Sequence, residues 1–261
     1  MKNIYPIEVK KLKFLYNNEK ILDDVNIKIE RGKFYSIIGP NGSGKTTLIK
    51  NICKILEGEN GHIFINEKDI NKMDFNTISK SISVVSQDTN IDFHFSVMDI
   101  VLMGRTPYIK TFSTETYKDL NIAKEAMEFL DVWRLKDKNI RSLSGGERQR
   151  VLIARAICQN TDIILLDEPI SHLDIKYQID LLNKLKSLNI NKKITIISIL
   201  HDLNLASTYS DYIVLMNKGK IVDSGTSEQV LTKENIKNVY NIKVDILLHP
   251  TSHKPYIIPL F

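Results

Sequence analysis

The chain has 261 residues, enough for one sizeable hydrophobic core with at most a smaller subdomain attached. With 43% hydrophobic and 26% charged residues, its composition is that of an ordinary soluble globular protein. The net charge of +5 is compatible with an anionic membrane surface or a nucleic acid but requires neither. Because the lysines are scattered and form no tight run, we expect no nucleic-acid partner.

Targeting signals and cysteines give further limits. The first residues lack the apolar centre of a signal peptide, and no apolar stretch approaches the roughly 20 residues needed to span a bilayer. If the protein works at a membrane, we therefore expect it to do so through a partner protein. Cys53 and Cys158 both lie in apolar, helical-looking surroundings, so we interpret them as reduced core residues of a cytosolic protein.

Apolar runs and periodic patterns predict the elements in chain order. Residues 7–29 and 61–66 alternate in polarity around an Asn60-Gly61 turn signal, which predicts short antiparallel strands. Continuous apolar runs predict buried parallel strands at residues 34–38, 82–86, 163–166, 194–200 and 212–216. Helical patterns are found at residues 47–56, 119–130, 146–157, 175–188 and 203–209. The alternation predicts an α/β core of crossover units, with a strand-free helical stretch from about residue 96 to residue 157.

A glycine-rich motif directly follows the first parallel strand. It matches G-x-x-x-x-G-K-[ST] and consists of Gly39, Pro40, Asn41, Gly42, Ser43, Gly44, Lys45 and Thr46, with Thr47 next in the helix. Glycines let successive backbone N–H groups converge on phosphates at a helix N-terminus. We expect Lys45 to reach the β- and γ-phosphates of ATP and the Thr46 hydroxyl to ligate Mg²⁺.

Two carboxylates follow the buried strand at residues 163–166. The C-terminal tips of parallel strands are where such sheets bind ligands, so Asp167 and Glu168 are expected there. We expect Asp167 to hold Mg²⁺ through water and Glu168 to polarise the attacking water.

A second anion site is predicted in the signature segment, which consists of Leu143, Ser144, Gly145, Gly146 and Glu147. A serine and two glycines open a helix there, so free N–H groups and the helix dipole face outward. Ser144 and Glu147 also match a capping box, and the anion-site and capping interpretations are compatible.

The signature segment resembles that of the ATP-binding cassette (ABC) ATPases, and the resemblance covers nearly the whole chain. It implies a P-loop NTPase (RecA-like) parallel-sheet core, an N-terminal antiparallel β subdomain and an inserted helical subdomain. It also implies a head-to-tail dimer that holds two ATP molecules between the phosphate loop of one copy and the signature segment of the other. The partner is then a second copy or a paralogue.

Further roles follow only from this resemblance. Gln87 resembles the glutamine that contacts Mg²⁺ and water and relays contact to a transmembrane partner. Asp174 resembles a residue at the dimer seam, within Ser171-His172-Leu173-Asp174, and His201 resembles the switch histidine that contacts the γ-phosphate. Tyr16 resembles the aromatic residue that stacks on adenine, although Phe14 and Tyr16 also suit an ordinary strand.

Three stretches resemble the ATPases of iron-siderophore, haem and cobalamin importers, at residues 95–108, at residues 168–175 followed by Gln178, Leu181 and Leu182, and at residues 200–206. Ile170 departs from that pattern, where threonine is usual. In the same region Phe93, Phe95, Val97 and Met98 either form an exposed docking patch for a transmembrane subunit or pack the helical subdomain.

Together these features predict one ATPase domain over residues 1–240, in which residues 89–157 form the helical subdomain and residues 1–88 and 158–240 form the rest. Residues 241–261 form an extension without a predicted role. We expect an importer ATPase at the cytoplasmic face of the cell membrane, with permease subunits and, indirectly, an extracytoplasmic solute-binding protein as partners. Another ABC uptake or export system is the alternative. A soluble ABC protein that acts on ribosomes or DNA is disfavoured by length, and a P-loop kinase or GTPase does not explain the signature segment.

Overall fold

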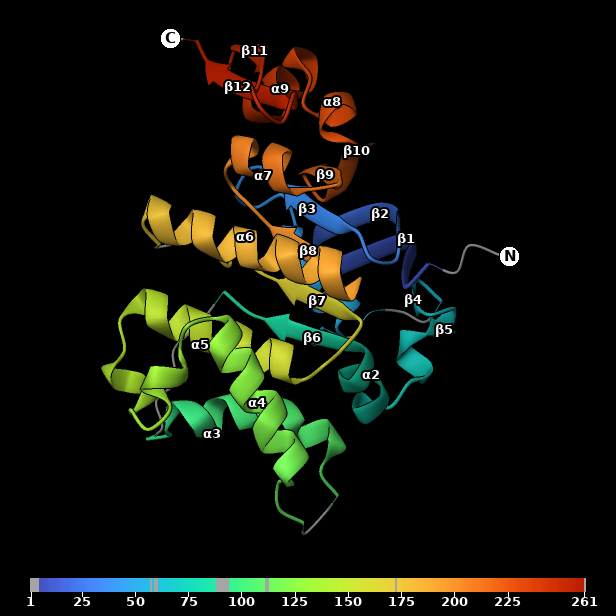
Figure 1. Cartoon of the computed structure of the whole chain (residues 1–261). Coiled ribbons are helices and arrows are strands. Elements are labelled where there is room, and N and C mark those ends of the chain that lie inside the picture. Colours follow the sequence, from blue (N-terminus) through green and yellow to red (C-terminus); the bar gives the residue numbers. More distant parts are fainter. Residues whose placement is uncertain are drawn as a thin grey trace.

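The structure is a computed structural model, and it describes residues 5–56, 58, 61–87, 94–110, 113–171 and 173–260. A central six-stranded sheet separates a smaller N-terminal sheet from covering helices (Figure 1). A group of helices lies beyond one edge of the central sheet, and the C-terminal elements lie beyond the other. The α/β class with a parallel-sheet core is confirmed.

The central sheet has the strand order β10-β9-β3-β8-β7-β6. Its strands are β3 (Phe34–Ile38), β6 (Ile82–Val85), β7 (Ile163–Leu166), β8 (Thr195–Ile199), β9 (Tyr212–Asn217) and β10 (Lys220–Gly225). The five strands from β9 to β6 run parallel, as predicted, and β10 pairs antiparallel with β9. The sequence does not predict β10, because its side chains are half-buried or exposed and include polar residues such as Asp223 and Ser224.

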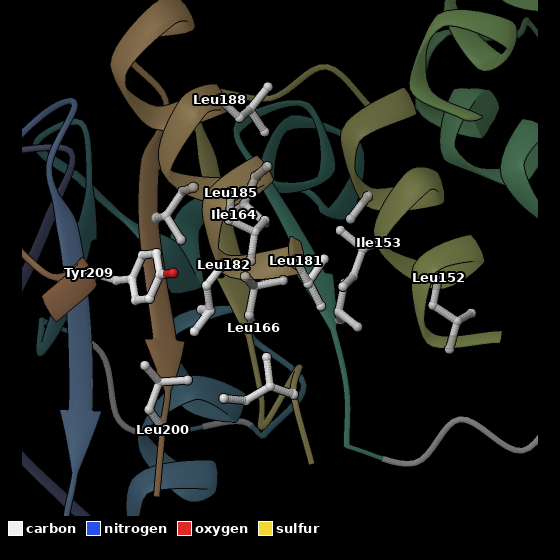
Figure 2. Packing of buried hydrophobic residues seen from close by; sticks show 14 of the residues in the cluster. Leu152, Ile153, Ile164, Leu166, Leu181, Leu182, Leu185, Leu188, Leu200 and Tyr209 are labelled. Atoms are coloured by element: carbon white, nitrogen blue, oxygen red, sulfur yellow. The ribbon is translucent and has the colours of Figure 1, made fainter. Parts of the chain in front are cut away.

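Both faces of the sheet are covered, which explains its continuous apolar strands. Alternate side chains point to opposite faces. Ile164 and Leu166 therefore pack toward α5 (Gly145–Cys158) and α6 (Ile175–Lys192), as Figure 2 shows, while Ile163 and Leu165 face the core shared with the N-terminal sheet and α1 (Lys45–Ile52). Full burial of one such side chain contributes about 1.5–3 kcal/mol.

The N-terminal sheet is antiparallel, as predicted, with the order β2-β1-β4-β5. Its strands are β1 (Ile7–Tyr16), β2 (Glu19–Ile29), β4 (Ile63–Ile65) and β5 (Lys68–Asp69), and η1 (Ile70–Lys72) and α2 (Phe75–Ser81) follow. Asn60 of the expected turn signal lies outside the described residues.

Helices dominate the stretch that was predicted to be strand-free. They are α3 (Val97–Leu102), η2 (Met103–Tyr108), α4 (Tyr117–Phe129), η3 (Trp133–Leu135), η4 (Ile140–Ser142) and α5. α3, α4 and α5 each begin at a capping box, with Ser96, Thr116 and Ser144 as the N-cap residues. Their core is continuous with that of the sheet, and the subdomain boundaries stay a prediction. No helix within the described ranges is long and apolar enough to cross a membrane.

The expected docking patch is not an exposed surface. Val97 is fully buried, and Phe95 and Met98 are partly buried against the main core. Phe93 lies outside the described residues. These side chains therefore pack the helical segment, which is the second of the two interpretations.

The C-terminal part carries elements that the sequence does not predict. After α7 (Leu203–Tyr209) and the β9–β10 hairpin come α8 (Ser227–Val230), α9 (Lys233–Tyr240), β11 (Val244–Leu248) and β12 (Pro255–Pro259). β11 and β12 form an antiparallel hairpin, and β12 packs against α7. The segment without a predicted role is thus a hairpin attached to the helix that follows His201.

Both cysteines are free and buried, as predicted. Burial raises the pKa of Cys53 to about 11 and that of Cys158 to about 12. Neither thiol is therefore a nucleophile at neutral pH.

Candidate functional site

Four parallel strands bring the predicted catalytic residues into one cavity of about 670 Å³. β3 leads into the phosphate loop, β6 ends before Gln87, β7 before Asp167 and Glu168, and β8 before His201. The carboxyl ends of parallel strands share one edge of the sheet, so these segments meet there. This first cavity is lined by Ile21, Asn41, Gly42, Ser43, Gly44, Lys45, Thr46, Thr47, Gln87, Glu168 and His201.

Lys45 is held at the base of the first cavity by the phosphate loop itself. Its Nζ donates hydrogen bonds to the carbonyl oxygens of Gly39 and Pro40, both at 2.9 Å, and the side chain is buried. A lysine ammonium has three N–H donors, so one remains for a phosphate oxygen. Burial lowers the pKa of Lys45, and the carboxylates of Glu168 and Asp167 oppose that shift.

Two further features of the loop fit a phosphate ligand. Gly44 precedes α1 with φ of +98°, and a Cβ there would lie 2.8 Å from a methyl carbon of Leu22, so only glycine suits this close approach. The Ser43 hydroxyl is buried at 2% exposure and has no hydrogen-bond partner among the described residues. An anion that accepts from this hydroxyl would satisfy it.

Thr46 and Asp167 form a pair of oxygen ligands that fits Mg²⁺. The Thr46 Oγ1 donates to Asp167 Oδ1 at 3.1 Å, and Asp167 is 2% exposed. The pKa of Asp167 is raised, because burial outweighs the opposing effect of the hydrogen bond from Thr46. Mg²⁺ binds hard oxygen atoms and is typically held by one or two carboxylates together with water and substrate phosphates. A threonine hydroxyl beside one buried carboxylate therefore suits this ion, and Gln87 lines the same cavity.

Glu168 lies between Gln87 and His201, two residues whose roles the family resemblance implies. Its Oε2 accepts a hydrogen bond from Gln87 Nε2 at 3.0 Å, and its Oε1 lies 2.6 Å from His201 Nε2. The three side chains thus hold one another at the mouth of the cavity. A carboxylate so oriented can accept a proton from a water molecule placed between it and a phosphate.

The signature segment lines a different cavity, of about 410 Å³. Its lining residues are Arg134, Ser144, Gly145, Gly146, Glu147, Arg150, Leu173, Asp174 and Tyr177. The predicted capping box is present: Glu147 N donates to Ser144 Oγ at 3.3 Å, and Ser144 N donates to Glu147 Oε2 at 3.2 Å. The two cavities share no lining residue, so one copy of the chain does not unite Lys45 with Ser144.

Some residues of the second cavity escape prediction from sequence. The Arg150 guanidinium lies over the Tyr177 ring at 4.8 Å, and Arg134 pairs with Glu147 at 3.2 Å. Arg134 and Tyr177 come from segments without a motif, and only their positions in the fold identify them. Asp174 caps α6 by accepting from Tyr177 N at 3.2 Å, while His172 lies outside the described residues.

Tyr16 and Ile170 do not line the first cavity. Tyr16 is 61% exposed at the end of β1 and is not among the cavity's lining residues, whereas Ile21 of β2 is. Stacking of Tyr16 on adenine stays a prediction. Ile170 is buried and packs in the main core, so the usual threonine is replaced here without an apolar group entering the cavity.

Comparisons with known proteins agree with this geometry. The family model described as "ABC transporter" matches residues 22–171, more than half of the chain. The chain is 36% identical to the iron(3+)-hydroxamate import ATP-binding protein FhuC of Bacillus subtilis, over 92% of this chain and 89% of that protein. It is also 36% identical to the hemin import ATP-binding protein HmuV of Hahella chejuensis, over 91% of this chain and 93% of that protein.

Solved structures that resemble this chain are also those of ABC proteins. An inward-facing metal-chelate type ABC transporter resembles this chain with a TM-score of 0.85 and 30% identity, over 99% of this chain and 98% of that one. The cassette MJ0796, a dimer in a post-hydrolysis state with ADP and Pi, resembles it with a TM-score of 0.75 and 27% identity, over 84% and 98%. The chain therefore belongs to the ABC transporter family.

Proposed function

We propose that this chain is the ATP-hydrolysing subunit of an importer for iron chelates, either ferric siderophores or haem, with cobalamin as a related cargo. The observation that carries the proposal is the convergence of Lys45, Glu168 and His201 on one cavity, together with a signature segment that lines another. The import ATP-binding proteins that resemble the chain over most of its length supply the cargo class.

Hydrolysis in the first cavity follows from the contacts of its residues. Lys45 neutralises charge on the β- and γ-phosphates, and Glu168 accepts a proton from the water that attacks the γ-phosphorus. The bond between that phosphorus and the bridging oxygen breaks, and ADP leaves with inorganic phosphate. His201 and Gln87 orient Glu168 and the water. When bound beside Thr46 and Asp167, Mg²⁺ supplies further charge neutralisation at the phosphates.

Two copies of the chain are needed for a complete site. In this proposal the outward N–H groups and hydroxyl at Ser144 to Gly146 bind the γ-phosphate held by Lys45 of the other copy. The N-terminus of α5 favours such an anion through its free N–H groups and its dipole. The dimeric cassette bound to ADP and Pi supports this arrangement.

A groove of about 370 Å³ is the surface that we assign to the permease. This docking groove runs between α2, η2 and the C-terminal end of α5. Ile55, Phe75 and Met103 line it and are 59%, 63% and 39% exposed, respectively. Large exposed apolar side chains gathered at one groove mark an interaction site.

The charge of the groove indicates the chemistry of its occupant. Arg155 lines the groove, burial lowers its pKa, and no carboxylate among the described residues forms an ion pair with it. Arg155 is half-buried, and a partly desolvated cation is stabilised by a partner with negative charge. We therefore expect a short cytoplasmic helix of the permease whose apolar face covers Phe75 and whose carboxylate or terminal carbonyls reach Arg155. This docking would hold the chain at the cytoplasmic face of the membrane.

Replacing Glu168 by Gln tests the catalytic assignment. The amide keeps the size of the side chain but cannot accept the proton, so ATP binding should persist while turnover falls by about 10²–10⁴-fold. Size-exclusion chromatography with ATP and Mg²⁺ should then detect a trapped dimer. Glu115→Gln, at an exposed position, is the matched control and should behave as wild type. Wild-type turnover of Glu168→Gln would overturn the assignment.

Another ABC uptake or export system is the second candidate, because the motifs are shared. Uptake of labelled ferric siderophore by cells with and without the gene separates the two. Loss of uptake supports the iron-chelate importer, and unchanged uptake with altered efflux supports the exporter.

A further inference from the structure

The C-terminal end of α5 forms part of the docking groove and holds both of its walls. On one side, η2 lies directly on the helix: a Cβ on Gly104 would collide with the Arg155 carbonyl oxygen and lie 3.1 Å from Gln159 N. On the other side, the Gln159 side chain donates hydrogen bonds to Ser79 O at 2.5 Å and Ile82 O at 3.0 Å. Anything that moves the groove therefore acts on the end of α5.

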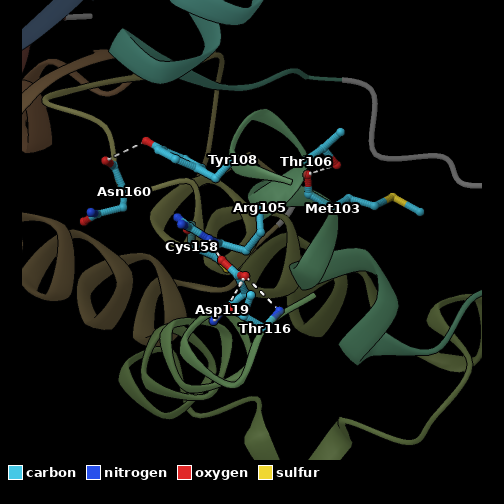
Figure 3. A network of polar contacts seen from close by, with 8 residues as sticks. All are labelled: Met103, Arg105, Thr106, Tyr108, Thr116, Asp119, Cys158 and Asn160. Atoms are coloured by element: carbon cyan, nitrogen blue, oxygen red, sulfur yellow. Dashed lines mark hydrogen bonds and ion pairs between the residues drawn. The ribbon is translucent and has the colours of Figure 1, made fainter. Parts of the chain in front are cut away.

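Arg105 of η2 is a buried charged residue at this junction. Its Nη1 donates to the carbonyl oxygen of Cys158, the last residue of α5, at 3.0 Å, and its Nε donates to Asp119 Oδ1 at 2.9 Å (Figure 3). Arg105 and Asp119 are 5% and 7% exposed. Thr116 Oγ1 donates to the second oxygen of Asp119 at 2.6 Å, and the Tyr108 ring lies 4.0 Å from the guanidinium. Two hydrogen bonds and one ring contact thus hold the side chain of Arg105.

The opposite end of α5 carries the signature segment. The helix runs from Gly145 to Cys158, and 14 residues at 1.5 Å per residue give a rod of about 21 Å. Because a helix is stiff, contacts that fix the C-terminal end of α5 also determine the direction of its N-terminal end. The positive charge of Arg105 also suits the negative C-terminal end of the helix dipole.

A buried ion pair is weak evidence for stability, because desolvation of the charges offsets their attraction. A role in positioning α5 explains the ion pair between Arg105 and Asp119 better, since a guanidinium binds two acceptors in a fixed arrangement. We propose that Arg105 is a positioning residue that fixes the C-terminal end of α5 to the wall of the docking groove and thereby aims Ser144 and Gly146 at the ATP held by a second copy. This inference rests on the proposed function. In this proposal α5 connects the docking groove to the ATP site that two copies of the chain form together.

The test uses the full-length chain in the Glu168→Gln background, with a double substitution, Arg105→Met with Asp119→Asn. Both charges are removed together, so neither is left buried and unpaired. The ATP concentration for half-maximal dimer formation should rise about tenfold, because a charge-assisted hydrogen bond is lost at α5. Binding of the fluorescent analogue MANT-ATP to the monomer, which uses the phosphate loop, should not change.

An ion pair between α6 and the segment after α4 provides the control. Lys184 of α6 donates to Phe129 O at 2.9 Å and pairs with Asp131 at 3.1 Å, so it also joins a carbonyl to a carboxylate, and neither of these two contacts involves α5. Lys184→Met with Asp131→Asn should leave the dimerisation curve unchanged. If the first double variant does not fold, as judged by circular dichroism, Arg105→Lys replaces it, because lysine keeps the charge and lacks the fork.

Each outcome is decisive. A rightward shift of the dimerisation curve with unchanged MANT-ATP affinity supports the proposal. Equal curves for the Arg105 and Lys184 variants overturn it, as does a parallel loss of MANT-ATP affinity, which a merely structural role would cause. If Glu168→Gln alone does not dimerise with ATP, the proposed function itself fails, and the inference fails with it.

Discussion

Glu168 has a left-handed backbone, with φ of +54°, a conformation that is rare for residues other than glycine. Its carbonyl oxygen accepts hydrogen bonds from Ser171 Oγ at 2.8 Å and from Ser171 N at 3.2 Å, which hold this conformation. Strained residues of this kind persist where the surrounding structure fixes them, and they gather at functional sites. The turn directs the carboxylate toward Gln87 and His201, which a regular continuation of β7 would not do.

The buried carboxylate of Asp119 gives a prediction about acid stability. Hydrogen bonds from Thr116 and the Arg105 guanidinium lower the pKa of Asp119 to about 2, from an ordinary value of 3.8. A depressed pKa in the folded state contributes stability that is present above pH 4 and is lost as the pH falls toward 2. In Asp119→Asn this contribution is absent, so its free energy of unfolding should fall less steeply over that range. Urea unfolding at a series of pH values measures how steeply the free energy of unfolding depends on pH in the wild type and in Asp119→Asn. Equal slopes for the two proteins would contradict the low pKa assigned to Asp119.

Residue-level prediction works best where the chemistry is local in sequence. Lys45 and Thr46 belong to one strand–loop–helix unit, so their spacing alone indicates a phosphate site. Ile21 and Tyr177 line the two cavities without any motif, because only the packing of distant segments brings them there.

At the scale of elements, α7 connects His201 to the C-terminal hairpin. Asn204 donates to Ile257 O at 3.2 Å and accepts from Ile257 N at 2.7 Å, so its amide completes the pairing of β12. Ser207 Oγ donates to Pro255 O at 2.7 Å. The helix begins two residues after His201, and the hairpin therefore supports its position.

Replacing Asn204 by Ala should destabilise the chain. Two backbone groups of Ile257 would lose their partner, which costs about 1–3 kcal/mol in the free energy of unfolding. Asn191→Ala is the control: its exposed amide donates to Ser187 Oγ, and the change should stay within about 0.5 kcal/mol. Chemical denaturation measures both, and equal stability of the two variants would show that the hairpin does not depend on this contact.

Element prediction follows the strength of the local pattern. Leu203–Tyr209 matches its predicted bounds because Asp202 caps the helix by accepting from Asn204 N and Leu205 N. α1 ends at Ile52, before the predicted residue 56, because Lys54 adopts a left-handed φ of +58°. The β11–β12 hairpin has exposed apolar residues such as Leu247 and Leu248, so its pattern does not alternate as an ordinary surface strand does.

At the scale of the whole molecule, the separation of the two cavities dominates the function. The phosphate loop, which we propose holds one side of the nucleotide, lines one cavity, and the signature segment lines another that shares none of its residues. The sequence predicts both anion sites, and the family resemblance predicts that they do not meet in one chain. The fold agrees, because α5 lies with the helices beyond β6, whereas the phosphate loop follows β3, three positions away in the strand order (Figure 1). An isolated copy should consequently be a poor ATPase.

The most direct test of this split site is a structure of Glu168→Gln crystallised with ATP and Mg²⁺. The account predicts a two-fold dimer in which each γ-phosphate lies within hydrogen-bond distance of Lys45 Nζ in one copy and of the Ser144 hydroxyl or the Gly146 N–H in the other. ATP bound at Lys45 while the signature segments of both copies face solvent would contradict it.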